Sequence, residues 1–188
     1  MDNKPFSVIK RGLKVTGNYL INILLFTILA LMLIEVAQDS TAAVMPYFSF
    51  AMFWILFLFV YGDMRITAQK EKRPFYNINP SPFKGILYGV IGITPVAVLQ
   101  VVLILVKAPE GFEVMKLRVL QAFTGPLYWI AKLLGGTPIM YIPSLAAVVL
   151  MAFLGYYAGH HDFLLSEWVR KKLGIKPRPP KKRVTHKR

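Results

Sequence analysis

Residues 86–106, ILYGVIGITPVAVLQVVLILV, decide the fold of this chain, because they form an uninterrupted apolar run without a single charge. A helix needs about 20 apolar residues to cross roughly 30 Å of hydrocarbon. Three further stretches of similar length have the same character: 19–37, 44–61 and 139–158. The sequence therefore predicts an all-α, polytopic integral membrane bundle of four transmembrane helices.

Composition agrees with this class. The chain has 188 residues, of which 55% are hydrophobic and only 17% are charged, whereas soluble domains carry about 25% charged residues. It contains no cysteine, so disulfide bonds, thiolate catalysis and cysteine-bound metal are excluded. The first apolar run is longer than the h-region of a typical signal peptide. We therefore expect no cleavage near Thr41-Ala42-Ala43.

The distribution of positive charge predicts the orientation. Of the 23 Lys and Arg residues, nineteen lie in three segments: before the first span, between the second and third spans, and after the fourth. Lys and Arg near transmembrane ends stay in the cytoplasm. The sequence thus predicts a cell-membrane protein with both termini cytoplasmic. Its regions are a basic N-terminus (1–18), a transmembrane domain (19–160) with a cytoplasmic loop (62–85), and an amphipathic exit followed by a basic, disordered tail (161–188).

One outer stretch, 119–135, is apolar enough to be mistaken for a fifth span. Gln121, Lys132 and the Gly125-Pro126 break make it a poor spanning helix, and an odd number of spans would move the basic tail outside. We expect the whole amphipathic segment 112–135 to form two short helices that lie on the outer leaflet or dip into it. The alternative is a re-entrant element, because non-helical backbone at membrane depth is tolerated only where protein or a cavity surrounds it.

Small residues recur on one face of the third and fourth spans. They predict close helix packing, either between these spans or against a partner; the set is Gly85, Gly89, Gly92, Ala152, Gly155 and Gly159. Polar groups within the spans are few. Thr94 and Pro95 near mid-span, with Gln100 further along, predict a small polar site or a hydrogen bond between helices.

The segment GHHDF, 159–163, raises the question of a metal or catalytic site at the end of the fourth span. Adjacent histidines on a helix point about 100° apart, and metalloprotease helices instead place them four residues apart. We therefore expect no metal site and no cofactor. Helix-end and headgroup roles suit this group better: Asp63, Arg65, His160, His161 and Asp162.

The last segment is rich in Pro, Lys and Arg. Such clusters attract anionic lipid or another polyanion, and the contact residues expected are Arg170, Lys171, Lys172, Lys181, Lys182 and Arg183. No base-reading fold accompanies them, so sequence-specific nucleic-acid binding is not expected.

No motif of an enzyme is present. The leading hypothesis is a non-enzymatic subunit or adaptor that binds a membrane-protein partner, or a second copy of itself, in an anionic bilayer. The alternatives are a small oligomeric transporter built around Pro95 and Gln100, and a lipid-modifying enzyme that uses Asp63, His160, His161 and Asp162.

Overall fold

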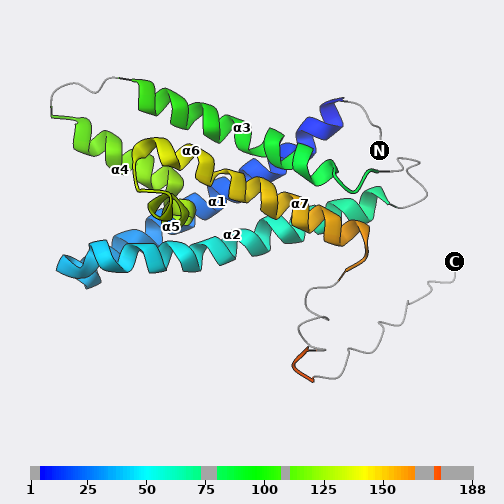
Figure 1. The fold of residues 1–188 in the computed structure, drawn as a ribbon, viewed down its shortest axis with the longest axis horizontal. Helices are drawn as coiled ribbons and strands as arrows, with labels where there is room; N and C mark the ends of the chain where they lie inside the picture. Colours follow the sequence, from blue (N-terminus) through cyan, green and yellow to red (C-terminus); the bar gives the residue numbers. More distant parts are fainter. Residues whose placement is uncertain (1–4, 73–79, 107–110, 164–171, 175–188) are drawn as a thin grey trace, which may run out of the picture.

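The computed structural model describes residues 5–72, 80–106, 111–163 and 172–174. Every regular element within these residues is a helix, and the long helices run side by side along the longest axis (Figure 1). Four helices are long and apolar enough to cross a membrane: Phe6–Ala37, Thr41–Glu71, Lys84–Leu105 and Pro138–His160. This confirms the predicted all-helical class and its four long apolar helices.

The first two long helices form an antiparallel pair. Helix α1 covers Pro5–Ala37, the 3-10 turn η1 covers Gln38–Ser40, and α2 covers Thr41–Glu71. Gln38 takes a positive φ of 40°, which reverses the chain within three residues. Both helices extend beyond the spans predicted for them, 19–37 and 44–61. The reason is that their inner faces continue to be buried, with Val15 and Met64 among the residues shielded from solvent.

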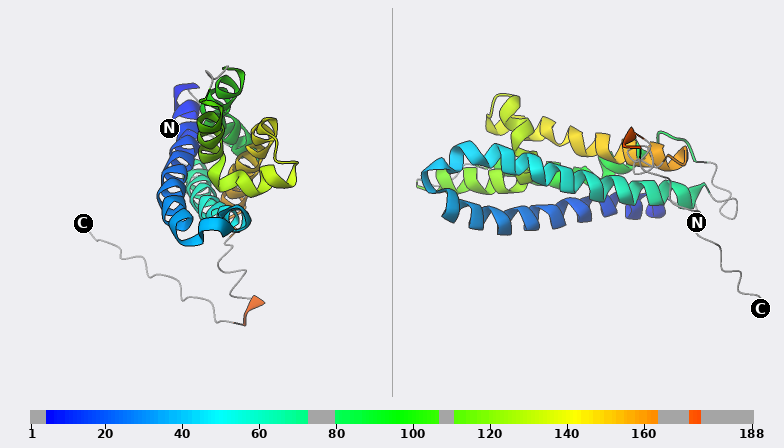
Figure 2. Two further views of the ribbon diagram at one scale, coloured as in Figure 1. Left: turned by 90° about the vertical axis from the view of Figure 1, so that its left-hand side faces the viewer. Right: turned by 90° about the horizontal axis from the view of Figure 1, so that it is seen from below.

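The remaining long helices complete the bundle. Helix α3 covers Lys84–Leu105 and is continuous through Pro95, which lies on an exposed face. The last long segment consists of η4 (Pro138–Met140), α6 (Tyr141–Ser144) and α7 (Ala146–His160). Helix α7 packs against both α2 and α3. Viewed along the long axis, the helices surround a common core (Figure 2).

Two short helices follow α3 and turn back on each other. They are α4 (Glu113–Thr124) and α5 (Tyr128–Leu133), joined by the 3-10 turn η3 (Gly125–Leu127); we call residues 113–133 the α4–α5 hairpin. The turn is buried, because Gly125, Pro126 and Leu127 lie against α1 and α2. The hairpin is therefore an integral part of the bundle.

Glycine allows the helices to approach closely. A Cβ atom on Gly89 would lie 2.9 Å from Val149 Cα, and one on Gly155 would lie 2.6 Å from the Tyr61 carbonyl oxygen. The small residues singled out from the sequence all lie between helices of this same chain: Gly85, Gly89 and Ala152 between α3 and α7, Gly92 against α1, and Gly155 and Gly159 against α2.

Candidate functional site

A carboxylate is buried among four helices at one end of the bundle. At this end, which we call the basic end, α1 and α3 begin and α2 and α7 finish. Glu71 of α2 is 1% exposed and forms an ion pair with Arg11 of α1. It also accepts hydrogen bonds from the hydroxyl groups of Tyr88 and Tyr156, each at 2.7 Å. Lys84 Nζ lies 4.0 Å from its second oxygen.

This network joins all four long helices through one side chain. Buried charges are stable only when they are paired and hydrogen-bonded, and here one carboxylate receives donors from α1, α3 and α7. Arg11 also donates to the Tyr88 hydroxyl at 3.2 Å. Because its oxygens are engaged by these donors, Glu71 acts as a structural anion that fixes the basic end.

The GHHDF segment lies at the C-terminal end of α7. The Lys72 ammonium donates to the His160 carbonyl oxygen at 2.8 Å and to the Asp162 carboxylate at 2.6 Å. It therefore caps the helix, whose last carbonyls carry partial negative charge. The same hydrogen bond lowers the pKa of Asp162 below its ordinary value. The His161 ring lies against that of Tyr157, with centroids 4.4 Å apart and the ring planes tilted by 50°.

The other residues predicted for this interface have separate partners. Asp63 accepts a hydrogen bond from Asn18 of α1 at 2.8 Å, while Arg65 lies beside Gly159 of α7. Within the described ranges, no group of three or more His, Asp or Glu side chains could hold a metal ion. Asp63 is thus bound by α1, whereas Asp162 is bound by Lys72, the residue that follows α2.

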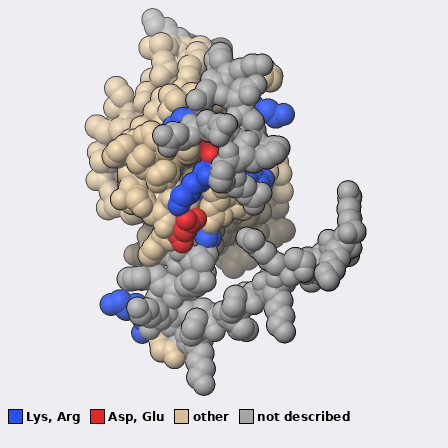
Figure 3. All heavy atoms as spheres, turned by 90° about the vertical axis from the view of Figure 1, so that its right-hand side faces the viewer, with Lys and Arg blue, Asp and Glu red and all other residues tan. Residues whose placement is uncertain are grey.

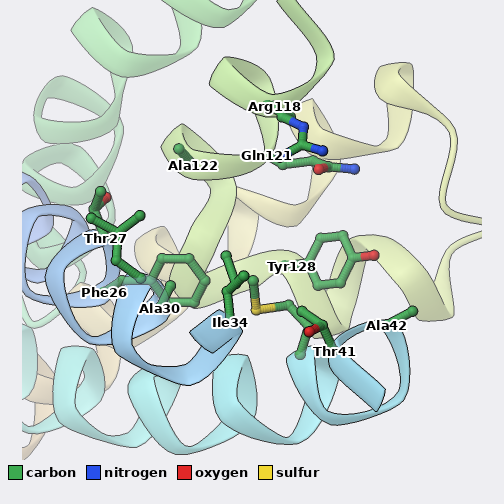
Figure 4. A pocket seen from close by; sticks show the side chains of 12 residues that line it. Phe26, Thr27, Ala30, Ile34, Thr41, Ala42, Arg118, Gln121, Ala122 and Tyr128 are labelled. Carbon is green, nitrogen blue, oxygen red and sulfur yellow. The ribbon is translucent and has the colours of Figure 1, made fainter. Parts of the chain in front are cut away.

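The opposite end of the bundle contains a cavity of about 630 Å³, which we call the hairpin pocket (Figure 4). One wall is formed by α1 and α2 and the other by the α4–α5 hairpin. Its lining is Phe26, Thr27, Ala30, Leu31, Ile34, Thr41, Ala42, Met45, Arg118, Gln121, Ala122 and Tyr128. The polar ends of the Arg118, Gln121 and Tyr128 side chains lie on the hairpin side, and mostly apolar side chains face them.

Hydrogen bonds between α2 and the turn hold the hairpin in place. The Ser49 hydroxyl donates to the Gly125 carbonyl oxygen at 2.6 Å and accepts from the Trp129 backbone N–H at 3.1 Å. From α1, the Tyr19 hydroxyl donates to the Phe123 carbonyl oxygen at 2.8 Å. These bonds satisfy backbone groups that the helix break leaves without helical partners, so the pocket wall is fixed to the bundle.

The polar residues predicted near mid-span do not form one site. Thr94 is exposed and donates to the Val90 carbonyl oxygen of its own helix. Gln100 is fully buried on another face and donates to the Thr124 hydroxyl at 3.4 Å, while its own carbonyl oxygen has no partner. The structure therefore places Gln100 beside the hairpin and away from Thr94 and Pro95.

A second buried amide lies near the same turn. Asn22 of α1 is 0% exposed, and neither its oxygen nor its nitrogen has a hydrogen-bond partner. Along α1 it stands between Tyr19, which binds the Phe123 carbonyl, and Phe26, which lies against Gly125. Unpartnered amide atoms thus lie on α1, which contacts the α4–α5 turn, and on α3, where Gln100 reaches Thr124 at the end of α4.

Most of the predicted lipid-contact residues fall outside the described residues. Arg170, Lys171, Lys181, Lys182 and Arg183 lie there, whereas Lys172 is described and is exposed. The residues that sequence reasoning missed are Arg11, Glu71, Arg118 and Gln121. In the sequence, Arg11 and Glu71 are charged residues outside the predicted spans 19–37 and 44–61. The sequence does contain a signal that Arg11 is buried, because Arg11 shares a helical face with Val15 and Tyr19, which are apolar or aromatic.

Comparison with protein-family models, with curated proteins and with solved structures gives no match. The function is therefore inferred from the Glu71 network and the hairpin pocket.

Proposed function

We propose that this chain is a non-enzymatic, multi-pass protein of the cell membrane that binds an anionic amphiphile in the hairpin pocket. In this role it serves as a subunit or adaptor of a membrane complex. Both termini lie in the cytoplasm under this proposal, because Lys and Arg gather at the basic end. The hairpin pocket then belongs to the outer half of the bundle.

The observation that carries the proposal is the division of the pocket into two unlike walls. Its volume of about 630 Å³ lies within the roughly 300–1,000 Å³ typical of small-molecule sites. Phe26, Leu31 and Ile34 offer apolar surface for a hydrocarbon chain. Arg118, Gln121 and Tyr128 offer a cation and two hydrogen-bonding groups for its head.

Arg118 supports an anionic head group in particular. It is exposed and forms no ion pair with any residue that the structure describes. A guanidinium presents a planar set of N–H donors that matches a carboxylate or phosphate in bidentate geometry. An anion at the pocket mouth would give this charge its partner.

The engagement of Glu71 supports binding over catalysis. A general base must come within hydrogen-bonding reach of the proton that it takes, and Glu71 is only 1% exposed, which keeps a substrate away from its carboxylate. Glu71 already accepts from Arg11, Tyr88 and Tyr156. Asp162 is likewise bound to Lys72.

The proposal is tested by purifying the tagged, full-length protein from its native host in mild detergent. Bound lipids are extracted and identified by mass spectrometry, together with any protein that co-purifies. We expect an anionic amphiphile in stoichiometric amount with the wild type, and its loss from Arg118→Gln. Lys132→Gln is the matched control, because it removes the same charge from an exposed position on α5. Equal lipid content in all three proteins would refute the proposal.

The helix faces that are open to a protein partner are not the glycine faces of the third and fourth spans. A Cβ atom on Gly17 or Gly62 would have nothing within 4 Å, whereas one on Gly89 would meet Val149 and Ala152. Gly17 and Gly62 stand next to the linked pair Asn18 and Asp63. We expect Gly62→Leu to reduce the amount of co-purifying partner at unchanged helix content. A partner that is retained in full would place the interface elsewhere.

A second candidate function, transport, is favoured by the unpartnered amides of Asn22 and Gln100. An unsatisfied polar group inside a protein costs about 1–3 kcal/mol, so a solute or water at the hairpin turn would offset that loss. The polar site of such a transporter would lie at the α4–α5 turn and not beside Thr94 and Pro95. If the protein is a transporter, the flux of solute into proteoliposomes should fall in Gln100→Leu and persist in Thr94→Val. Equal flux in both variants would remove this candidate.

A further inference from the structure

A second cavity opens at the basic end, between α1 and α2. Its volume is about 200 Å³, and we call it the basic-end cavity. The lining residues are Ser7, Lys10, Arg11, Lys14, Thr67, Lys70 and Glu71. Figure 3 shows this end of the molecule, where Lys and Arg side chains surround the few acidic ones. Four cations and one carboxylate line the cavity, so its field favours an anion.

Arg11 has a donor that the protein does not use. One guanidinium nitrogen, Nη1, binds Glu71 and Tyr88, whereas the other, Nη2, is buried and has no hydrogen-bond partner. The side chain is only 6% exposed. Because burial without a partner is unfavourable for such an N–H group, an acceptor in the cavity that Arg11 lines would stabilise the structure.

Neither Glu71 nor Thr67 blocks an anion here. The Glu71 carboxylate is neutralised by Arg11 and accepts from two tyrosine hydroxyls. The Thr67 hydroxyl donates to the Asp63 carbonyl oxygen at 2.8 Å. The binding groups left for a ligand are therefore Arg11 Nη2 and the ammonium groups of Lys10, Lys14 and Lys70, which are all exposed on the cavity rim.

We propose that the basic-end cavity binds a phosphate group. A tetrahedral phosphate presents several acceptor oxygens at once, which suits one buried guanidinium N–H and three flexible ammonium groups. The outer surface beside the cavity is apolar: Phe6, Ile9, Leu13 and Ile66 are exposed there. Such a border fits the acyl side of a phospholipid, and soluble phosphate shares the same head-group chemistry. This site is separate from the hairpin pocket and does not depend on the proposed function.

The test uses full-length protein in detergent with two probes. Phosphatidylglycerol binding is measured by native mass spectrometry, and inorganic phosphate binding by calorimetry on delipidated protein. The site variant is Lys10→Gln/Lys70→Gln, which leaves Arg11 and Glu71 intact. The control is Lys181→Gln/Lys182→Gln, which removes the same charge from the tail. We expect the site variant to bind its ligand roughly tenfold or more weakly, since it removes two of the four cations that line the cavity.

The two probes separate the sources of the phosphate. Lipid binding that depends on Lys10 and Lys70, without phosphate binding, assigns the site to a phospholipid head group. Phosphate binding with the same dependence, without lipid binding, assigns it to a soluble anion. Unchanged binding of both probes in the site variant, or binding of neither by the wild type, would overturn the proposal. Should the double variant fail to fold, Lys14→Gln serves as the second variant, with the same expected direction.

Discussion

At the scale of single residues, Glu71 connects more of the molecule than any other side chain described above. Its partners Arg11, Tyr88 and Tyr156 come from α1, α3 and α7. Sixty positions separate Arg11 from Glu71 along the chain. The sequence shows both as ordinary charges near helix ends, and only the packing of four helices brings them together.

Removal of the Glu71 carboxylate should destabilise the protein strongly. Glu71→Ala leaves Arg11 buried without its counterion, and breaking a buried pair in this way costs about 3–5 kcal/mol. We expect a clear fall in the melting temperature of the detergent-solubilised protein. The double variant Arg11→Met/Glu71→Met should recover part of the loss, since an apolar pair can replace a buried ion pair, while the hydroxyl groups of Tyr88 and Tyr156 still lack their acceptor.

The control for this experiment is the exposed pair at the end of α7. Asp162→Asn removes the charge that pairs with Lys72 and keeps a residue type that tolerates the positive φ of 53° at this position; exposed ion pairs contribute little because water and salt screen them. Its melting temperature should match that of the wild type. Similar losses in Asp162→Asn and Glu71→Ala would contradict the central role that we assign to Glu71.

At the scale of helical elements, glycine positions with and without neighbours should respond in opposite directions. Gly155→Ala places a Cβ atom 2.6 Å from the Tyr61 carbonyl oxygen of α2, and overpacking of this kind costs about 1–3 kcal/mol. Gly17→Ala meets nothing and should stabilise α1 by up to about 1 kcal/mol through helix propensity. Thermal unfolding of the two variants in the same detergent measures both effects. Equal shifts in the same direction would show that α2 and α7 do not meet at Gly155.

The α4–α5 hairpin should depend on Ser49. Ser49→Ala removes a donor to Gly125 and an acceptor for Trp129, and buried groups left unsatisfied cost about 1–3 kcal/mol each. Hydrogen exchange within 113–133 should therefore become faster. Thr94→Val is the control, because Thr94 bonds only within α3. If exchange in the hairpin were unaffected by Ser49→Ala, the attachment to α2 would be wrong.

Helical elements were the part most accessible from the sequence. Long apolar runs and the Gly125-Pro126 break predicted four long helices and a pair of short ones, because helix formation and apolar composition are local properties. Helix ends were less accessible: α1 begins at Pro5, well before Tyr19. Residues such as Arg11 continue the helix because they find partners across the bundle; the face that Arg11 shares with Val15 and Tyr19 indicates burial, but it does not identify Glu71 as the partner.

At the scale of the whole molecule, the two ends of the bundle differ in chemistry. One end has the buried network of Glu71 and a small cavity rimmed by lysines. The other has the larger hairpin pocket with Arg118 on its wall. The distribution of Lys and Arg along the sequence predicted the basic end. The hairpin pocket could not be foreseen, because it forms only when the α4–α5 hairpin folds back against α1 and α2.

We propose that these ends face opposite sides of a membrane, with the basic end in the cytoplasm. The chain has no cysteine, so single introduced cysteines report on position without background. Ser81→Cys lies beside the start of α3, and Thr137→Cys lies beyond the hairpin; both positions are exposed. In intact cells, a membrane-impermeant maleimide should label Thr137→Cys at once and Ser81→Cys only after permeabilisation. Labelling of both from the same side, or of Ser81→Cys alone in intact cells, would contradict the account.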